Sequence, residues 1–418
     1  MMVDSSRMQQ VAAYPPAWPR HLAWRALAAR WHRRGGLTDA QLAATAVAYP
    51  LDYYRPAWPI RVALFCVTVL GVLLGSGFLA LLAAGATVGD FNVTAWAVLL
   101  LISSGVLLEL TIRHNRLYHA GPDNALLYAA LLAAAVLIGR LQLLRLDGSV
   151  NDFSLGQPSL LPSLLLLLVV LLAAGVRYAD RGVAGAAFVG YLLVIANLLL
   201  PWGWGRLLLP FGMMAAAGMV VWLARTPRQV LAATYYYEGA RQTLRLLALV
   251  VFYLAGNYLV VREGNASLRG DFVSAHPPLG ALFIGLTAAV PLAYVALGLR
   301  RHDRLLLTLG LLAAAFSVYT LRAYRSVLPP AIAASLAGAA LVILAVVLLR
   351  YLRPRRHGLT SLPDAGAASA DDTANPFARA NLEALAAVEL TPVAAPDAGP
   401  ATTFGGGEFG GGGASSGY

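Results

Sequence analysis

The stretch Ser159-Leu-Leu-Pro-Ser-Leu-Leu-Leu-Leu-Leu-Val-Val-Leu-Leu-Ala-Ala-Gly-Val176 decides the fold. It contains no charged residue, and its length approaches the ~20 residues that a helix needs to cross about 30 Å of hydrocarbon. Comparable apolar blocks recur along most of the chain, flanked by arginine, proline and polar residues. The sequence therefore predicts an all-α fold, a polytopic transmembrane helix bundle.

The composition of the whole chain supports this class. Of the 418 residues, 59% are hydrophobic and 12% are charged, whereas soluble domains carry about 25% charged residues. The net charge is +11, and all 31 basic residues are arginine. Because these arginines lie singly or in pairs at the ends of apolar blocks, they indicate membrane topology, and nucleic-acid binding is not expected. The single cysteine, Cys66, excludes a disulfide framework and a cysteine-based metal site.

Three regions follow from the distribution of the apolar blocks. Residues 1–59 are predicted to form a cytoplasmic N-terminal helical segment, and residues 60–352 a transmembrane bundle. Residues 353–418 form an Ala/Pro/Gly-rich cytoplasmic tail, which has too little apolar surface to offset its ordering entropy and is expected to be disordered. About ten spans are predicted, at 60–84, 93–112, 125–143, 159–176, 182–200, 207–224, 246–261, 278–299, 305–321 and 329–352.

Arginine counts in the loops between these spans predict the orientation. The even-numbered loops hold eleven arginines and the odd-numbered loops six. Positively charged loops are retained on the cytoplasmic side. Both termini are therefore predicted to be cytoplasmic, in a multi-pass protein of a bacterial inner membrane. Splitting or merging one apolar block would reverse the sign of half the loops, so the counts also favour ten spans.

Four polar residues within the predicted spans are candidates for function, because polar groups in hydrocarbon are costly. They are Glu109, Arg140, Asn197 and Asn257. Each also has a structural interpretation. Glu109 lies one turn before Arg113 and can pair with it, Arg140 can extend to the headgroups, and Asn197 can lie at the interface. Asn257 alone is predicted to be clearly buried, where an asparagine typically bonds a neighbouring helix.

Glycine and proline mark candidate interruptions of the spans, at Gly75, Gly77, Pro210 and Pro291. Gly75 and Gly77 lie in the first span and Pro210 in the sixth, which are equivalent positions if ten spans form two inverted halves. Interrupted helices at equivalent positions are typical of transporter sites. Close helix packing is the alternative for the glycines, and Pro291 is predicted to kink the eighth span.

The N-terminal region carries a resemblance to a family. The run Trp31-His-Arg-Arg-Gly-Gly-Leu-Thr-Asp-Ala-Gln-Leu-Ala43 has the capping-box pattern, with Gln three residues after Thr. Together with Gly71-Val-Leu-Leu-Gly-Ser-Gly-Phe-Leu-Ala-Leu-Leu82, it resembles a group of uncharacterised bacterial polytopic membrane proteins that open with a short helix-Gly-Leu-(Ser/Thr)-x-x-Gln element. This resemblance implies a fold type and no particular chemistry. Ten spans with short loops are also similar in architecture to the drug/metabolite transporters.

Function is predicted from what these regions offer. The loops are too short to form a domain, and no cofactor, metal site or catalytic set is indicated by the spacing of carboxylates, histidines or cysteine. The first hypothesis is a protein that is not an enzyme, an envelope scaffold, sensor or assembly factor with the lipid bilayer and a protein at its cytoplasmic ends as partners. The alternative is a secondary transporter of a small amphipathic solute. A dry interior with an ordered N-terminal segment would favour the first hypothesis, and hydrated interior polar residues the second.

Overall fold

The computed structural model describes most of the chain up to residue 324. The described residues are 11–33, 35–83, 93–145, 154–225, 231–270, 274, 276–301 and 303–324, with isolated residues between 335 and 350. Within these ranges the chain is helical and has no strand beyond one isolated bridge, so the predicted all-α class is confirmed. About two thirds of the predicted tenth span lies outside the described residues, and the predicted tail, 353–418, lies wholly outside them.

The described helices follow the apolar blocks and the capping residues. In chain order they are α2 (Ala17–Arg33), α3 (Asp39–Ala48), α4 (Trp58–Ala83), α5 (Val93–Asn115), α6 (Pro122–Arg145), η2 (Pro158–Leu160), α7 (Leu161–Tyr178), α8 (Arg181–Leu199), α9 (Gly205–Arg225), α10 (Leu231–Gly256), α11 (Tyr258–Arg269), α12 (Gly280–Arg301) and α13 (Arg304–Tyr324). The predicted capping box is confirmed. The Thr38 hydroxyl accepts a hydrogen bond from the backbone N–H of Gln41, and the Gln41 side chain accepts one from the backbone N–H of Thr38. Farther along the chain, α11 ends at Gly270, which has a left-handed backbone conformation with a φ of 74°.

Seven of these helices are long and apolar enough to cross a membrane, or eight if the bent pair α10–α11 is one span. Predicted spans one to six correspond to α4 through α9, and the eighth corresponds to α12. The predicted ninth span corresponds to α13, whose apolar part, Arg304–Thr320, is shorter than the seven candidate spans. Together these helices make the chain a multi-pass membrane protein.

The predicted seventh span, 246–261, is wrong as a single helix. Helix α10 begins at Leu231, well inside the predicted loop, and ends at Gly256, and α11 continues at an angle of 77° to it. Asn257 lies at the break and caps α11. Apolar residues lie on both sides of Asn257, so a span can be predicted from the sequence there but its bend cannot.

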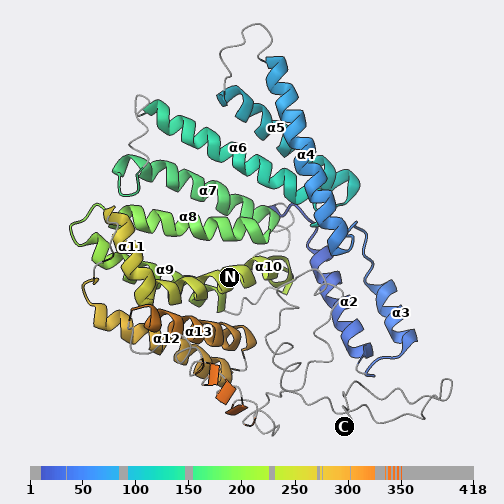
Figure 1. Cartoon of the computed structure of the whole chain (residues 1–418). Coiled ribbons are helices and arrows are strands. Elements are labelled where there is room, and N and C mark those ends of the chain that lie inside the picture. Colours follow the sequence, from blue (N-terminus) through green and yellow to red (C-terminus); the bar gives the residue numbers. More distant parts are fainter. Residues whose placement is uncertain are drawn as a thin grey trace, which may run out of the picture.

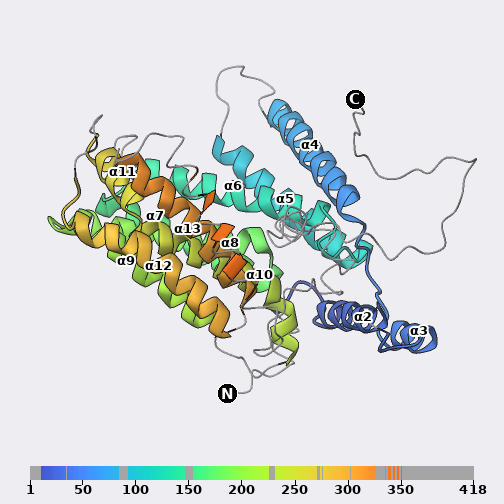
Figure 2. The same cartoon turned by 60° about the horizontal axis from the view of Figure 1, so that its bottom comes forward.

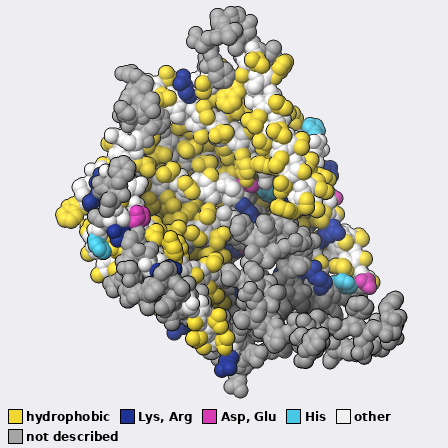
Figure 3. Space-filling view, in the orientation of Figure 1, with side chains coloured by type: hydrophobic (Ala, Val, Ile, Leu, Met, Phe, Trp, Pro, Cys, Tyr) yellow, Lys and Arg dark blue, Asp and Glu magenta, His cyan; other side chains and the backbone are white. Residues whose placement is uncertain are grey.

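The apolar surface of the bundle matches a membrane environment. In Figure 1, α8, α9, α10, α12 and α13 lie side by side, while α4 stands at one edge and crosses α5 and α6. Where the face in Figure 3 is not grey, hydrophobic side chains prevail and charged side chains are few. Exposed tryptophans, a residue type enriched at membrane–water interfaces, lie at both ends of the bundle. Trp58 and Trp222 lie near one end of the bundle and Trp202 and Trp204 at the other.

The N-terminal segment joins the end of the bundle where the arginine-rich loops meet. The Ala13 N–H donates to the Arg177 carbonyl at 2.8 Å, and the Tyr54 N–H donates to the Arg116 carbonyl at 2.9 Å. Helices α2 and α3 lie beyond this end, crosswise to α8, α10 and α12 (Figures 1 and 2). The structure thus places the N-terminal segment and the even-numbered loops on one side, which is called the N-terminal end below.

Candidate functional site

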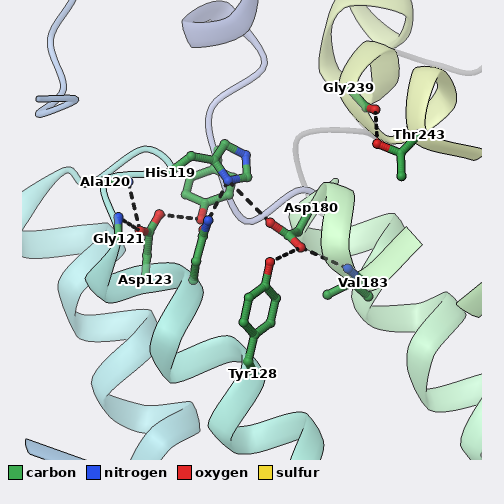
Figure 4. Close-up of polar contacts among 11 residues, drawn as sticks. His119, Ala120, Gly121, Asp123, Tyr128, Asp180, Val183, Gly239 and Thr243 are labelled. Carbon is green, nitrogen blue, oxygen red and sulfur yellow. Dashed lines mark hydrogen bonds and ion pairs between the residues drawn. The ribbon is translucent and has the colours of Figure 1, made fainter. Parts of the chain in front are cut away.

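A cluster of buried and half-buried polar side chains fastens the N-terminal segment to the bundle. The docking cluster consists of Tyr14, His119, Asp123, Tyr128 and Asp180, drawn from the N-terminal segment, the α5–α6 loop, α6 and the α7–α8 junction. Most of it appears in Figure 4. Its two carboxylates are buried, Asp123 at 0% and Asp180 at 3% exposure. Buried carboxylates require hydrogen-bond donors, and the chain supplies them from both backbone and side chains.

Asp123 organises the loop that precedes α6. Its Oδ1 accepts hydrogen bonds from the backbone N–H groups of Ala120 and Gly121, at 2.9 Å and 3.1 Å. Its Oδ2 accepts from the Tyr14 hydroxyl at 2.8 Å. One carboxylate therefore holds the loop and the N-terminal segment at once, and the first turn of α6 fixes where the segment attaches.

Asp180 connects the docking cluster to α8. Its Oδ1 accepts from the Val183 N–H at 2.9 Å, as an N-cap does, and from the Tyr128 hydroxyl at 2.8 Å. Its Oδ2 lies 3.8 Å from Nδ1 of His119. His119 lies between Asp180 and Asp123 (Figure 4), and its Nδ1 also faces Oδ1 of Asn124 at 3.2 Å. The imidazole is thus enclosed by groups from both sides of the cluster.

Tyr14 is the anchor of the N-terminal segment. Its side chain is 1% exposed, and its ring meets Tyr118 edge-on, with ring centroids 5.1 Å apart. Next to it, the hydroxyl of Tyr236 on α10 donates to the Arg177 carbonyl, the same carbonyl that accepts from the N–H of Ala13. The segment that leads into α2 is therefore held by α6, α7 and α10 together.

Burial and charge shift the protonation of two groups here that lie outside the spans. The pKa of Tyr14 is raised well above its ordinary value, mainly by burial and then by the charge of Asp123. The pKa of His119 is lowered, mainly by burial and further by the charge of Arg55, against the opposing pull of Asp123 and Asp180. Tyr14 therefore remains a hydrogen-bond donor, and neutral His119 is the form that the folded state favours.

We expect the protein to lose stability as the pH falls below about 6.5, the ordinary pKa of histidine. Because the folded pKa of His119 is depressed, the unfolded state binds the extra proton first, so stability is complete above the unfolded pKa and declines as the pH falls through the folded pKa. Thermal unfolding in detergent, measured across this range, checks the slope. His119→Gln should flatten it, whereas His114→Gln, at an exposed position on α5, should not. Equal slopes in the two variants would contradict this assignment.

Glu109 lies beside the docking cluster and pairs with more than the predicted partner. Its Oε2 is 3.6 Å from Arg113, as predicted one turn away. Its Oε1 accepts closer bonds from the Arg177 guanidinium at 2.7 Å and the Tyr178 hydroxyl at 2.7 Å. The pair with Arg177 joins α5 to α7, a contact between residues far apart in sequence. Glu109 is thus part of the fastening at the N-terminal end.

A second polar group lies inside the bundle at the bend between α10 and α11. The intramembrane network consists of Tyr253, Asn257, Thr287, Ser317 and Thr320, each buried. Asn257 is 0% exposed. Its Oδ1 accepts from the Leu259 N–H at 3.0 Å and caps α11, and its Nδ2 donates to the hydroxyls of Tyr253 at 2.9 Å and Thr320 at 3.1 Å. As predicted, the buried asparagine bonds a neighbouring helix, here α13.

The same network compensates the proline in α12. Pro291 has no N–H to donate to the carbonyl four residues earlier, at Thr287. The hydroxyl of Ser317 on α13 donates to this carbonyl at 2.5 Å. The Thr287 hydroxyl accepts from the Tyr258 N–H at 2.9 Å, at the start of α11, and donates to the Phe283 carbonyl at 2.7 Å. The polar groups that the bend and the proline leave open are therefore bonded to protein groups.

The two remaining polar candidates lie apart from both groups. Asn197 is buried near the end of α8, where its amide accepts from the Gly156 N–H at 2.8 Å and donates to the Gln157 carbonyl at 3.1 Å. It fixes the turn before α7 instead of lying at the interface. Arg140 is half-buried on α6, and its Nε has no hydrogen-bond partner among the described residues. The structure thus does not bring the four predicted polar residues together in one site.

No helix in the described part of the chain breaks at the predicted interruptions, while a kink of α12 at Pro291, which an unbroken helix allows, stays a prediction. Helix α4 runs unbroken through Gly75 and Gly77, and α9 and α12 continue through Pro210 and Pro291. A break within hydrocarbon leaves backbone groups unbonded, which a glycine does nothing to compensate. The observed break is at Asn257, whose side chain supplies the missing acceptor.

Sequence reasoning missed every member of the docking cluster, although two of them carry a local signal. Asp123 follows Gly121-Pro122 at the start of a span, and Asp180 immediately precedes α8, both typical of helix N-termini. Tyr14 carries no such signal, because its role depends on a contact with a residue 109 positions away. Comparison with protein-family models, curated proteins and solved structures gives no match.

Proposed function

We propose that this multi-pass membrane protein is a non-catalytic scaffold, sensor or assembly factor of a bacterial inner membrane that works through its N-terminal helices α2 and α3 on the cytoplasmic side. The observation that carries the proposal is the Tyr14–Asp123 hydrogen bond, buried and 2.8 Å long. It couples a segment outside the bundle to the ends of several spans. A partner bound to α2 or α3 would therefore act directly on the spans, and the spans on the partner.

The exposure of α3 also supports a role in binding. No residue of α3 is buried, and Val47 is 82% exposed. Helix α3 is thus a capped helix outside the bundle whose side chains are open to a partner. Meanwhile the intramembrane network is enclosed and internally bonded. A dry interior with an ordered N-terminal segment is the combination expected of an interaction protein.

Cross-linking in cells tests the proposal. A photoreactive amino acid at Val47 should give one discrete protein adduct, which mass spectrometry would identify. The matched control is Leu74 on α4, which is 75% exposed but lies in a span and should react with lipid. The adduct at Val47 should weaken in a Tyr14→Ala variant, because loss of the anchor releases the helix pair. Absence of any protein adduct at Val47 would contradict the proposal.

A secondary transporter is the second candidate, favoured by one observation. Discontinuous helices build many transporter sites, and the α10–α11 pair is bent by 77° at Asn257. Transport requires water or solute to reach this bend. Flux of amphipathic solutes into proteoliposomes that contain the full chain, abolished by Asn257→Leu but not by Asn265→Leu on the same helix, would establish transport in place of the first proposal.

A further inference from the structure

The helix pair α2–α3 is held at the level of the membrane surface. Its first anchor, Tyr14, reaches Asp123 in the first turn of α6. Beyond its other end, Tyr54 forms a backbone bridge with Leu117 in the α5–α6 loop. Both anchors lie where spans end, and Trp58, 40% exposed, begins α4 at the same level. The pair is therefore fixed at the headgroup region of one leaflet.

The pair lies along this surface. Figures 1 and 2 show α2 and α3 beyond the N-terminal end and crosswise to α8, α10 and α12, whereas α4 runs close to the direction of α2 in Figure 1. A helix that crosses α8, α10 and α12, and lies close to where they enter the bilayer, runs roughly parallel to the plane that those three helices cross. Arginine and tryptophan are the side chains typical of helices in that position.

The charge of the helix pair α2–α3 is mainly positive. Helix α2 carries four arginines, whereas Asp39 is the only acidic residue in α2 and α3. Asp39 faces His32, with Nε2 3.4 Å from Oδ1. Among the described acidic residues, none forms an ion pair with the arginines of α2. These arginines, three exposed and Arg25 half-buried, are Arg20, Arg25, Arg30 and Arg33.

We propose that α2 binds the anionic phospholipid headgroups of the leaflet against which it lies. Phosphate oxygens would accept hydrogen bonds from the guanidinium groups, and the surface potential of anionic lipid attracts each arginine near it. Trp31, which is 48% exposed, places its indole ring at the same interface, whereas Trp24 stacks on Tyr49 at the end of α3. The charge is distributed around α2, so the binding is electrostatic and does not require deep insertion. The inference deepens the proposed function, because it gives the working element a lipid partner.

Hydrogen exchange in nanodiscs tests the lipid site. The full chain is placed in bilayers of phosphatidylcholine alone or of phosphatidylcholine with phosphatidylglycerol, and exchange of the α2 amides is followed by mass spectrometry. Exchange should slow by about fivefold or more in the anionic bilayer, because anionic lipid attracts each of the four arginines. The slowing should be smaller at high salt, which screens this attraction. A variant with all four α2 arginines changed to Gln should lose it.

The control variant carries Arg206→Gln and Arg269→Gln, two exposed arginines at the opposite end of the bundle, and should keep the full effect. Equal exchange in the two bilayers, or slowing that survives the four substitutions, overturns the lipid site and leaves α2 to a protein partner. The belt protein is the same in both kinds of nanodisc and no cellular partner is present, so this result is independent of the Val47 cross-link. Failure of one proposal is therefore distinguishable from failure of the other.

Discussion

Asn257→Ala should lower the free energy of unfolding by about 2–4 kcal/mol, the sum of a lost N-cap and a buried hydroxyl left without partners. The asparagine caps α11 and bonds Tyr253 and Thr320. Alanine removes every one of these bonds, and no water is available in hydrocarbon to replace them. Chemical unfolding in detergent measures the loss, and hydrogen exchange should show α11 released first.

Asn265→Ala is the matched control, on the same helix but outside the intramembrane network. Its side chain is half-buried and takes no part in that network, so the free energy of unfolding should change by less than about 1 kcal/mol. The double variant of Asn257→Ala with Thr320→Val should lose less than the sum of the two single variants, because the two side chains bond each other. Additive losses would mean that the network does not act as a unit.

Gly121→Ala should prevent the N-terminal end from assembling, at a cost above about 3 kcal/mol. The glycine has a φ of +115°, which side-chain-bearing residues rarely adopt. A Cβ there would lie 2.4 Å from the Arg61 carbonyl oxygen and 3.0 Å from the Phe65 nitrogen, both backbone atoms of α4. The loop would have to move, and Asp123 would lose its donor at Gly121 and its alignment with Tyr14.

The measurement is the yield of folded protein and the susceptibility of residues 11–57 to a protease. Gly139→Ala on α6 is the control, because nothing lies within 4 Å of the added Cβ. It should be neutral, or stabilise the helix by up to about 1 kcal/mol. Similar yields and similar cleavage in the two variants would contradict the view that the α5–α6 loop fixes the N-terminal segment.

Local patterns predicted the parts of this fold that depend on local chemistry. Span positions followed from apolar length, and the start of α3 followed from Thr38 and Gln41, since both signals act over a few residues. The bend at Asn257 could not be predicted, because a buried asparagine is equally compatible with a straight helix bonded to its neighbour. The bend depends on Thr287 and Thr320, which only the tertiary structure brings to it.

The docking cluster shows the same limit at the other end of the bundle. Asp123 and Asp180 lie at helix starts, a local signal that was not among the predicted site residues. Their shared role depends on Tyr14 and His119, which reach them from separate segments. For Glu109, the partner one turn away was predicted, but the closer partner, Arg177, lies 68 residues along the chain.

Thiol labelling tests most directly the central claim, that the polar interior is closed and the working surface lies at the N-terminal end. In a Cys66→Ala background, single cysteines replace Thr320, which is 0% exposed, and the exposed residues Val47 and Ser267. A membrane-impermeant reagent should label Val47→Cys from the cytoplasmic side only and Ser267→Cys from the other side only. Thr320→Cys should react from neither side until the protein is unfolded. Labelling of Thr320→Cys in the folded protein would show that water enters at the bend, and would contradict the account in favour of a transporter.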